Sequence, residues 1–564
     1  MVSGGDSAAV SAGPGERARH RQVARRVGLG RGEHRAVPLA GGTGDSVLHR
    51  GTRTAGCGFR RIDGASGEPR HQFVALGRLQ LDDLLQPVRR RFPAGAVEDG
   101  GDELSLEARV DFGTKHQEIH GFGFCQAFQR AAVIRDLPAS SRQEVLDLLL
   151  SPATGAGLSI LRLGIGSSAD GVYPNHRSIQ PADPGGPAAP PRYVWDGDDS
   201  GQVWLAKQAQ AYGVSRFYAS AWSAPGYMKD NGSDADGGTL RGLPGVLPAG
   251  DDWREGYAEY LLQYVRFYAG EGIRITDLGF ANEPEIARPY ATMQLNTEQM
   301  VDLAKVVGRA VEGQGLPLNV VCCDSLGWNF QAEFTAAIEA DPLAAASVAI
   351  HGAHQYGSRA NEHERMARSP LPTRRPNWMT EWSPDVLGDG WNARWDSGDP
   401  TDGIAVARNI HDCLTMADVS AYIYWFGASP DADTRALIRI DGERFHVSKR
   451  LGAVAAFSRF IRPGARRVSA HVSDGAVKVS AFENPDSSRV VELLNDGHEP
   501  FDVDVSAGPY ASWAGAAAYL TDSAHSLDRT HTARPAESGI SVRVPPRALL
   551  TIVVPGGPGV AGVR

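Results

Sequence analysis

Between residues 120 and 427 the sequence repeats one pattern, a short apolar run rich in strand-forming residues followed by a longer stretch with helical periodicity. There are eight such runs: 120–127, 158–165, 216–222, 275–283, 318–324, 348–356, 377–382 and 421–427. Helical stretches such as "GYAEYLLQYVRFYAGEG" lie between them. Strands that alternate with helices form parallel sheets. Eight such units predict an α/β fold, a (β/α)₈ TIM barrel; an open doubly wound sheet is the alternative.

The sequence on either side of this region has a different texture. After Gly427, runs such as "AVKVSAFENPDSSRVVELLNDG" alternate apolar and polar residues between turn signals, which is typical of a β-sandwich. The segment "LSLEARVDFGT", 104–114, alternates in the same way ahead of the barrel. We therefore predict a barrel over 116–450 and a β-sandwich side domain built from both ends of that region, 104–115 and 451–558.

Residues 1–103 differ again. They are rich in Gly, Pro and Arg, show no sustained apolar period and lack the apolar core of a signal peptide. This predicts a poorly ordered extension, or a start codon placed too far upstream. A basic arm that binds nucleic acid or a surface is the alternative. Only 76–88 has the pattern of a short helix.

The composition, with 42% hydrophobic and 22% charged residues, is that of a soluble globular protein. A formal charge of −9 argues against nucleic-acid binding as the main function, and no apolar run reaches the roughly 18 residues of a membrane span. The five cysteines have no zinc-type spacing. Cys322 and Cys323 are adjacent inside an apolar run, which predicts buried thiols.

The stretch "ITDLGFANEPEIA", 275–287, ends a strand at a carboxylate. Alternation along the strand places Glu283 on the face of the small residues, which suit a barrel interior, and Asn282 on the opposite face. Pro284 ends the ladder. We expect Glu283 to point towards the barrel mouth, where the active sites of TIM barrels lie. Glu285 lies beyond the strand and is expected to be a solvated loop carboxylate.

A second carboxylate, Glu381 in "NWMTEW", takes the last inward position of a later strand and is flanked by Trp378 and Trp382. If 275–283 is the fourth barrel strand, 377–382 is the seventh. Two glutamates among aromatic residues are what retaining glycoside hydrolysis requires, one as nucleophile and the other as acid and then base. The alternative is that one or both only pair with arginines in a structural role.

In this order of motifs the chain resembles glycoside hydrolase family 30, in particular its branch of xylanases and endo-β-1,6-galactanases. The motifs are "GFGFCQAFQRA", "TGAGLSILRLGIGSSAD", "YVWDGDDSGQVWLAKQA", "ASAWSAPGYMKDNG", "DLGFANEPE", "WMTEW" and "VSKRLGAVAAFSRFIRPGARRV". The fold that this resemblance implies, a TIM barrel with a β-sandwich from both termini, agrees with the pattern above. Cys125 and Gln126 stand where relatives often have Ser and Glu, which leaves the substrate preference open.

The resemblance also implies residue roles. Glu283 of the Asn-Glu-Pro motif corresponds to the family's acid/base and Glu381 to its nucleophile. Asn282 corresponds to an Asn near the sugar 2-hydroxyl. Arg162 corresponds to a buried Arg that keeps the nucleophile ionised, because an adjacent cation lowers the pKa of a carboxyl group.

Four further residues follow from the same comparison. His354 and Tyr356 correspond to a polar pair near the nucleophile. Trp222 and Trp425 are expected to be platforms on which sugars stack; core packing is the alternative for these two tryptophans. His351 and His354 could suggest a metal, but strand spacing places them on opposite faces and a third ligand is missing. We therefore expect no metal and no cofactor.

These observations together predict a retaining endo-β-glycanase that acts on a plant cell-wall polysaccharide. (Glucurono)xylan is favoured because Arg130, which follows the first strand, could hold a uronate with two hydrogen bonds. Alternatively Arg130 caps the next helix or pairs with an acid such as Asp136. An endo-β-1,6-galactanase acting on arabinogalactan side chains and a non-catalytic carbohydrate-binding protein are the other candidate functions.

We expect the partner to be a polysaccharide or oligosaccharide substrate, with no nucleic acid and no membrane, and a monomeric enzyme. The family resemblance implies secretion, although no signal peptide is visible in this chain.

Overall fold

The computed structural model describes residues 105–246, 251–357, 371–384, 391–431, 435–508, 512–530, 534–536 and 539–556. The chain divides into two units, and all of these residues belong to the second, Val97–Arg564. The predicted extension over 1–103 and the short helix at 76–88 lie outside the described residues.

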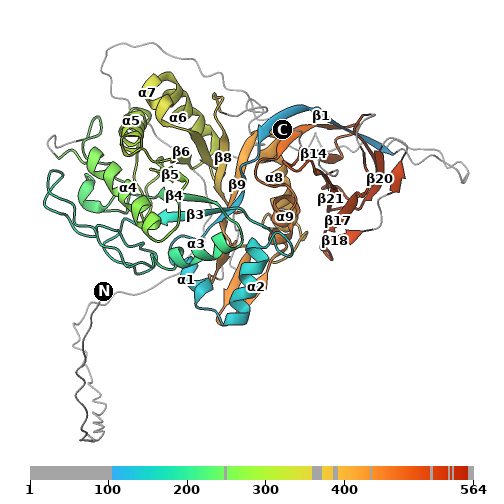
Figure 1. Ribbon diagram of the computed structural model, residues 1–564, viewed down its shortest axis with the longest axis horizontal. Helices are drawn as coiled ribbons and strands as arrows, with labels where there is room; N and C mark the ends of the chain where they lie inside the picture. Colours follow the sequence, from blue (N-terminus) through green and yellow to red (C-terminus); the bar gives the residue numbers. More distant parts are fainter. Residues whose placement is uncertain are drawn as a thin grey trace, which may run out of the picture. The chain divides into compact units, whose positions relative to one another are not determined.

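Eight parallel strands form a closed barrel, as the sequence predicts (Figure 1). Its strands are, in order, β2 (Gly121–Cys125), β3 (Ile160–Ile165), β4 (Arg216–Ala221), β5 (Asp277–Gly279), β6 (Asn319–Ser325), β7 (Ile350–His354), β8 (Asn377–Trp382) and β9 (Val419–Phe426). Strands β2, β3, β7 and β8 are buried along their whole length. This is expected for barrel strands, because side chains fill one face and helices cover the other.

The strands alternate with helices whose apolar faces join the barrel core. They are α1 (Arg130–Arg135), α2 (Ala139–Leu150), α3 (Gln202–Ala211), α4 (Arg254–Gly270), α5 (Thr297–Gln314), α6 (Trp328–Ala340), α7 (Pro342–Ser347), α8 (Gly403–Met416) and α9 (Lys449–Ser458). Helix α5 shows how the sequence sets the ends. Asn296 and Gln299 form a reciprocal capping box at its start, and Gly315 takes the left-handed conformation at its end, φ 61°.

The fourth barrel strand is shorter than the sequence predicts. Strand β5 ends at Gly279 rather than at residue 283. Beyond it the backbone leaves the ladder, and Glu283 has a φ of 45°, in the left-handed region. The alternation of faces therefore stops before Asn282, which does not lie on the face that strand alternation predicted for it.

The side domain is one ten-stranded sheet in the order β18-β17-β21-β15-β14-β13-β1-β16-β20-β19. Its members are β1 (Leu106–Glu118), β13 (Arg466–Val472), β14 (Val477–Glu483), β15 (Arg489–Asn495), β16 (Phe501–Ser506), β17 (Ala517–Thr521), β18 (Ser526–Thr530), β19 (Arg534–Ala536), β20 (Gly539–Val544) and β21 (Ala548–Val554). Strand β1 pairs antiparallel with β13 and parallel with β16. The prediction that the N-terminal strand joins the β-sandwich is confirmed.

Separate apolar cores lie under the β-sandwich sheet, between the barrel and its helices, and inside the barrel. One is enclosed by the β-sandwich sheet and includes Ala108 and Val110 of β1. Another lies between the barrel strands and the helix layer and extends to Phe482, Val490 and Leu494 on the β-sandwich strands. The barrel and the β-sandwich therefore share apolar packing. A smaller cluster that includes Ile160, Tyr218 and Trp378 fills the barrel interior. A small sheet of β10 (Ala428–Ser429), β11 (Ile438–Asp441) and β12 (Arg444–Val447) follows the last barrel strand.

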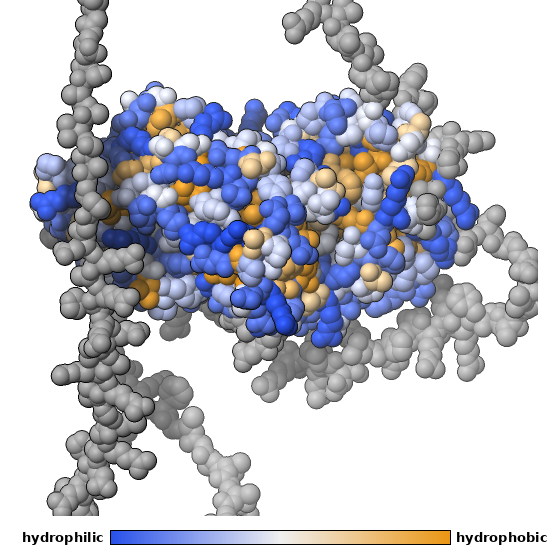
Figure 2. All heavy atoms as spheres, turned by 60° about the horizontal axis from the view of Figure 1, so that its bottom comes forward, coloured by the Kyte–Doolittle hydropathy of each residue, from blue (hydrophilic) through white to orange (hydrophobic). Residues whose placement is uncertain are grey.

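On the face shown in Figure 2 hydrophilic residues predominate, and hydrophobic residues form small groups. In the described part of the chain the exposed large apolar side chains include Val172, 71% exposed, and Tyr173, 53% exposed. No helix among the described residues is long and apolar enough to cross a membrane.

Candidate active site

Glu381 lies near the end of β8 and is 5% exposed. One carboxylate oxygen, Oε2, accepts a hydrogen bond from the Arg162 guanidinium at 2.5 Å. The other, Oε1, accepts one from the Tyr356 hydroxyl at 3.1 Å. The carboxylate of Glu381 thus has a cation and a neutral donor fixed against it.

Glu283 is delivered by the loop after β5 and is 6% exposed. Its backbone N–H donates to the carbonyl oxygen of Asp324 at 2.8 Å, which fixes the left-handed turn. Its Oε1 lies 3.0 Å from Nδ1 of His354. Among the described residues, no direct hydrogen bond from a guanidinium to this carboxyl group is seen.

The two carboxyl groups are close neighbours. One oxygen of each, together with a ring nitrogen of His354, lie within 4.8 Å of one another. Burial raises the pKa of Glu283 to about 7, although Arg162 and Arg288 act in the opposite direction. Burial also raises the pKa of Glu381, against the effect of the charged Arg162 beside it. Arg162 acts on Glu381 in the direction expected from the sequence, because its charge and its hydrogen bond lower the pKa of this carboxyl group against the effect of burial.

Arg162 is fully buried and links Glu381 to the barrel interior. Its second terminal nitrogen donates to Asn282 at 2.8 Å and to Asp324 at 2.7 Å. Its guanidinium lies 4.6 Å from the centre of the Trp222 ring. Asn282 consequently faces Arg162 inside the barrel.

Asp324 is a residue that the sequence did not single out. Its Oδ2 accepts hydrogen bonds from the Tyr218 hydroxyl at 2.6 Å and from the Ser220 hydroxyl at 3.0 Å, in addition to that from Arg162. It directly follows Cys322 and Cys323, which are joined by a disulfide and are not the separate thiols expected. Its place near the end of a predicted barrel strand could have marked Asp324 as a candidate site residue. Its contact with Arg162, however, could not be predicted without the folded barrel.

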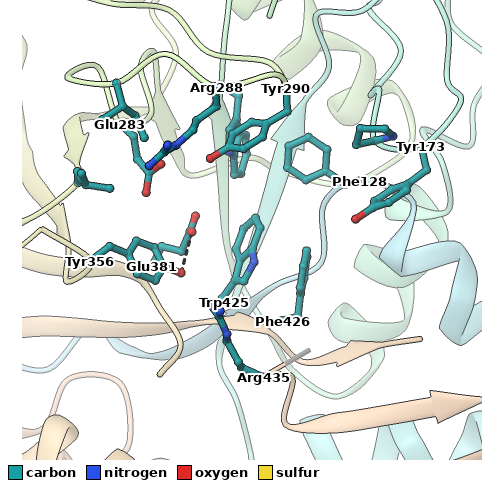
Figure 3. Close-up of a pocket in the computed structure, with 14 residues that line it drawn as sticks. Phe128, Tyr173, Glu283, Arg288, Tyr290, Tyr356, Glu381, Trp425, Phe426 and Arg435 are labelled. Atoms are coloured by element: carbon teal, nitrogen blue, oxygen red, sulfur yellow. Dashed lines mark hydrogen bonds between the residues drawn. The ribbon is translucent and has the colours of Figure 1, made fainter. Parts of the chain in front are cut away.

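Both carboxyl groups open into a pocket of about 410 Å³ (Figure 3). The predicted residues Trp222, Tyr356 and Trp425 line it as well. Lining residues that the sequence did not identify are Phe128, Tyr173, Pro174, Ile286, Arg288, Tyr290, Leu326, Phe426 and Arg435. Most of these lie on loops after different strands, and no periodic pattern marks them. The pocket is therefore strongly aromatic, with two glutamates and two arginines in its wall.

Arg130 does not present an open guanidinium at the rim, which corrects the position expected from the sequence. The residue is 4% exposed, and its guanidinium forms an ion pair with Asp431. It does not pair with Asp136, which contacts Arg135. The guanidinium also lies 4.1 Å from the centre of the Tyr173 ring.

Two other expectations concern charged groups near the site. Glu285 is not a solvated loop carboxylate: it is half-buried, its Oε2 accepts a hydrogen bond from the backbone N–H of Leu326 at 3.1 Å, and burial raises its pKa. His351 faces α6 and contacts Thr335 and Glu339, whereas His354 faces the barrel interior. The two histidines do lie on opposite faces, as strand spacing predicts.

Comparison with protein-family models gives two matches. Residues 119–312 match the TIM-barrel domain of glycosyl hydrolase family 30, and residues 464–552 match the β-sandwich domain of the same family. The two matches fall on the barrel and on the ten-stranded sheet. Both parts of the described architecture therefore agree with one family.

Individual relatives agree with this. The catalytic domain of a family 30 xylanase from Talaromyces cellulolyticus is 37% identical, with a TM-score of 0.73 over 79% of this chain and 99% of that one. An endo-1,6-β-D-glucanase from Trichoderma harzianum is 26% identical over 80% of this chain and 91% of its own length. A glucuronoxylanase from Bacillus subtilis is 23% identical over 69% and 78%, respectively. The chain belongs to glycoside hydrolase family 30, whose enzymes hydrolyse glycosidic bonds with retention of configuration.

Proposed function

We propose that the protein is an endo-β-glycanase that cleaves a plant cell-wall polysaccharide through a covalent glycosyl-enzyme intermediate. The observation that carries this is the approach of Glu283 and Glu381 to within 4.8 Å, in an aromatic pocket. Retaining enzymes hold their two carboxyl groups about 5–5.5 Å apart, whereas inverting enzymes need about 6.5–9.5 Å to admit a water molecule. The separation supports direct attack by one of the two carboxylates.

The surroundings of the two glutamates support Glu381 as the nucleophile and Glu283 as the acid/base. The anion of Glu381 is stabilised by hydrogen bonds from Arg162 and Tyr356. Glu283 has a pKa raised to about 7, so it holds a proton that it can give to the leaving oxygen. In the second step the ionised Glu283 would accept a proton from water as that water releases the sugar.

For the substrate we propose (glucurono)xylan. The 37% identical relative is a xylanase, and Arg288 and Arg435 line the pocket where a uronate substituent could be held. The 26% identical endo-1,6-β-D-glucanase keeps β-1,6-linked polymers as the second candidate. The support from Arg130 that the sequence suggested is withdrawn, because that guanidinium is paired with Asp431.

A reducing-sugar assay on glucuronoxylan, on xylan freed of uronate, on β-1,6-galactan and on β-1,6-glucan tests the substrate. We expect the highest kcat/KM on glucuronoxylan and a mixture of oligosaccharides as early products. Activity restricted to a β-1,6-linked polymer would replace the proposed substrate. Binding of a polysaccharide with no release of reducing ends would favour the non-catalytic alternative.

Two variants test the roles. Glu381→Gln should abolish turnover of all substrates while the melting temperature stays close to that of the wild type. Glu283→Gln should lose activity on polysaccharide but keep the first step on aryl glycosides, since a good leaving group needs no proton. Wild-type activity in Glu381→Gln would refute the assignment.

We also propose that the enzyme acts outside the cell. A cell-wall polymer is met there, and the disulfide between Cys322 and Cys323 is of a kind that persists in oxidising compartments. Fractionation of cultures of the producing organism, with activity assayed in medium and lysate, tests this; activity confined to the lysate would contradict it.

A further inference from the structure

The pocket has a second aromatic wall, away from the acid/base. In the view of Figure 3, Tyr173 and Phe426 lie on the opposite side of the pocket from Glu283. Tyr173 comes from the loop after β3, and Phe426 is the last residue of β9. Since Tyr173 is 53% exposed, a large part of its ring remains open to a ligand.

Behind this wall lies the buried Arg130. Its guanidinium carbon is 4.1 Å from the centre of the Tyr173 ring and 5.6 Å from that of Phe426. A planar guanidinium packs well against aromatic faces and is attracted by their negative potential. One cation therefore contacts both rings, although they come from segments about 250 residues apart in the sequence.

The position of Arg130 is itself fixed. Its guanidinium forms an ion pair with Asp431, which also accepts a hydrogen bond from the Ser429 hydroxyl at 3.1 Å. The Gln126 side-chain amide donates to the carbonyl oxygens of Arg130 at 2.9 Å and Ala428 at 2.7 Å. These bonds tie the start of α1 to the turn after β9. The buried arginine is thus held in place against the two rings.

Such a wall suits a sugar ring. The faces of a pyranose expose C–H groups, and these pack on flat aromatic side chains while the hydroxyl groups stay in water. Trp425 lies nearer the two carboxyl groups (Figure 3), and the Trp222 ring lies 4.6 Å from the guanidinium that holds Glu381, so these two rings are assigned to the sugar that is cleaved. The Phe426 ring packs on Trp425, with ring centres 4.1 Å apart, so Phe426 and Tyr173 extend the aromatic surface away from the carboxyl groups, towards a neighbouring sugar of the same chain.

We propose that Tyr173 and Phe426 form a stacking subsite for a sugar next to the one that is cleaved, and that Arg130 is the positioning residue of this subsite. The proposal rests on the proposed function, because it presupposes that the enzyme binds a chain of several sugars. It gives Arg130 a part in substrate recognition without contact between its guanidinium and a uronate.

The test is the dependence of kcat/KM on chain length, measured with linear β-1,4-xylo-oligosaccharides from the disaccharide to the hexasaccharide. We expect a steep rise for the wild type at the length that first reaches the subsite. Tyr173→Ala should lower kcat/KM by about tenfold, or about 1.4 kcal/mol, at and above that length. On the shortest cleaved substrate the change should stay within about twofold. Val172→Ala, the 71% exposed neighbour that does not line the pocket, is the matched control.

Arg130→Met keeps the length of the side chain and removes its charge, and it should reduce cleavage of the same long chains. It should reduce cleavage of decorated and undecorated xylan equally, whereas a uronate-binding role predicts a selective loss on decorated xylan. If Arg130→Met does not fold, Asp431→Asn removes the same ion pair with little change of shape. A profile in which Tyr173→Ala loses activity equally at all lengths, or at none, would overturn the subsite.

Failure of the substrate proposal can be told apart from failure of the subsite. If the wild type cleaves β-1,6-linked galacto- or gluco-oligosaccharides instead, the same length series in that sugar decides the subsite, and only the xylan proposal falls. If the folded wild type cleaves none of these chains, the proposed function and the subsite fall together.

Discussion

At the scale of single residues, the backbone of Glu283 is the most informative feature. A non-glycine residue with a φ of 45° is strained by about 1–3 kcal/mol unless its surroundings hold it there. Here the hydrogen bond to the carbonyl oxygen of Asp324 and the proline at position 284 hold it. The turn aims the carboxyl group at His354 and the pocket, so the strain has a direct use in presenting the proposed acid.

The raised pKa of Glu283 predicts the alkaline side of the pH profile. A general acid must be protonated, so kcat/KM on polysaccharide should fall about tenfold per pH unit as the pH rises above about 7. Below that pH Glu283 does not limit the rate. In Glu283→Gln the residual activity on an activated aryl glycoside should lack this alkaline limb. Persistence of the limb in that variant would assign it to another group.

Asp324 offers a second test at this scale. Its negative charge raises the pKa of Glu283, and its carboxylate binds the same guanidinium, that of Arg162, as Glu381 does. In Asp324→Asn the alkaline limb should move to lower pH, and kcat should fall by about ten- to a hundredfold through loss of alignment. Ser220→Ala removes a neutral hydrogen bond to the same oxygen and serves as the control. It should leave the limb where it is. If the alkaline limb of the pH profile stays in place in Asp324→Asn, Asp324 has only a structural role.

The sequence could predict that Glu283 and Glu381 meet in one pocket, because the carboxyl ends of barrel strands and the loops that follow them converge on one mouth, and because both residues lie in motifs that resemble those of the family. It could not predict Tyr173 or Phe128, since loop residues carry no periodicity and their positions depend on the folded loop. The position predicted for the Arg130 guanidinium was wrong, because Asp431, the residue with which it forms an ion pair, is about 300 residues away in the chain. Pairing at that range follows from topology and not from local pattern.

At the scale of elements, β1 is the strand on which the β-sandwich depends. It lies between β13 and β16 in the sheet, so it joins strands on either side through hydrogen bonds. Its buried face includes Ala108 and Val110, while Arg109 points outward. Loss of this strand would leave two parts of the sheet without a common neighbour.

We predict that Val110→Asp lowers the free energy of unfolding by about 3 kcal/mol or more, because it puts a charge into the apolar core of the β-sandwich. Arg109→Gln changes the adjacent side chain, which is 76% exposed, and should have almost no effect. Urea denaturation followed by circular dichroism measures both. Equal midpoints for the two variants would show that β1 contributes little.

Most elements were predictable from periodicity, with differences of a few residues at their ends. The clear exception is β5, where the apolar pattern continues to Ala281 but the ladder stops at Gly279. The residues there remain apolar because they are buried in the barrel, whether or not they pair. Burial and strand pairing impose the same composition, so the pattern cannot separate them.

At the scale of the whole molecule, the barrel and the β-sandwich share a core while the chain divides after Ala96. We predict that deletion of residues 1–96 changes kcat/KM by less than about twofold and the melting temperature by less than about 2 °C. Deletion through residue 118, which also removes β1, should lower the melting temperature strongly. A large loss from the shorter deletion would show that residues 1–96 stabilise the catalytic unit.

The place of β1 in the sheet has a consequence for how the protein is made. Ala108 pairs with Val472, so the ribosome must add 364 more residues before that partner exists. At about 5–20 residues per second this takes roughly 20–70 s. Throughout that time the nascent strand has neither of its neighbours, while the barrel segments emerge behind it. Slow translation or a shortage of chaperones should therefore damage the yield of this enzyme more than its finished stability suggests.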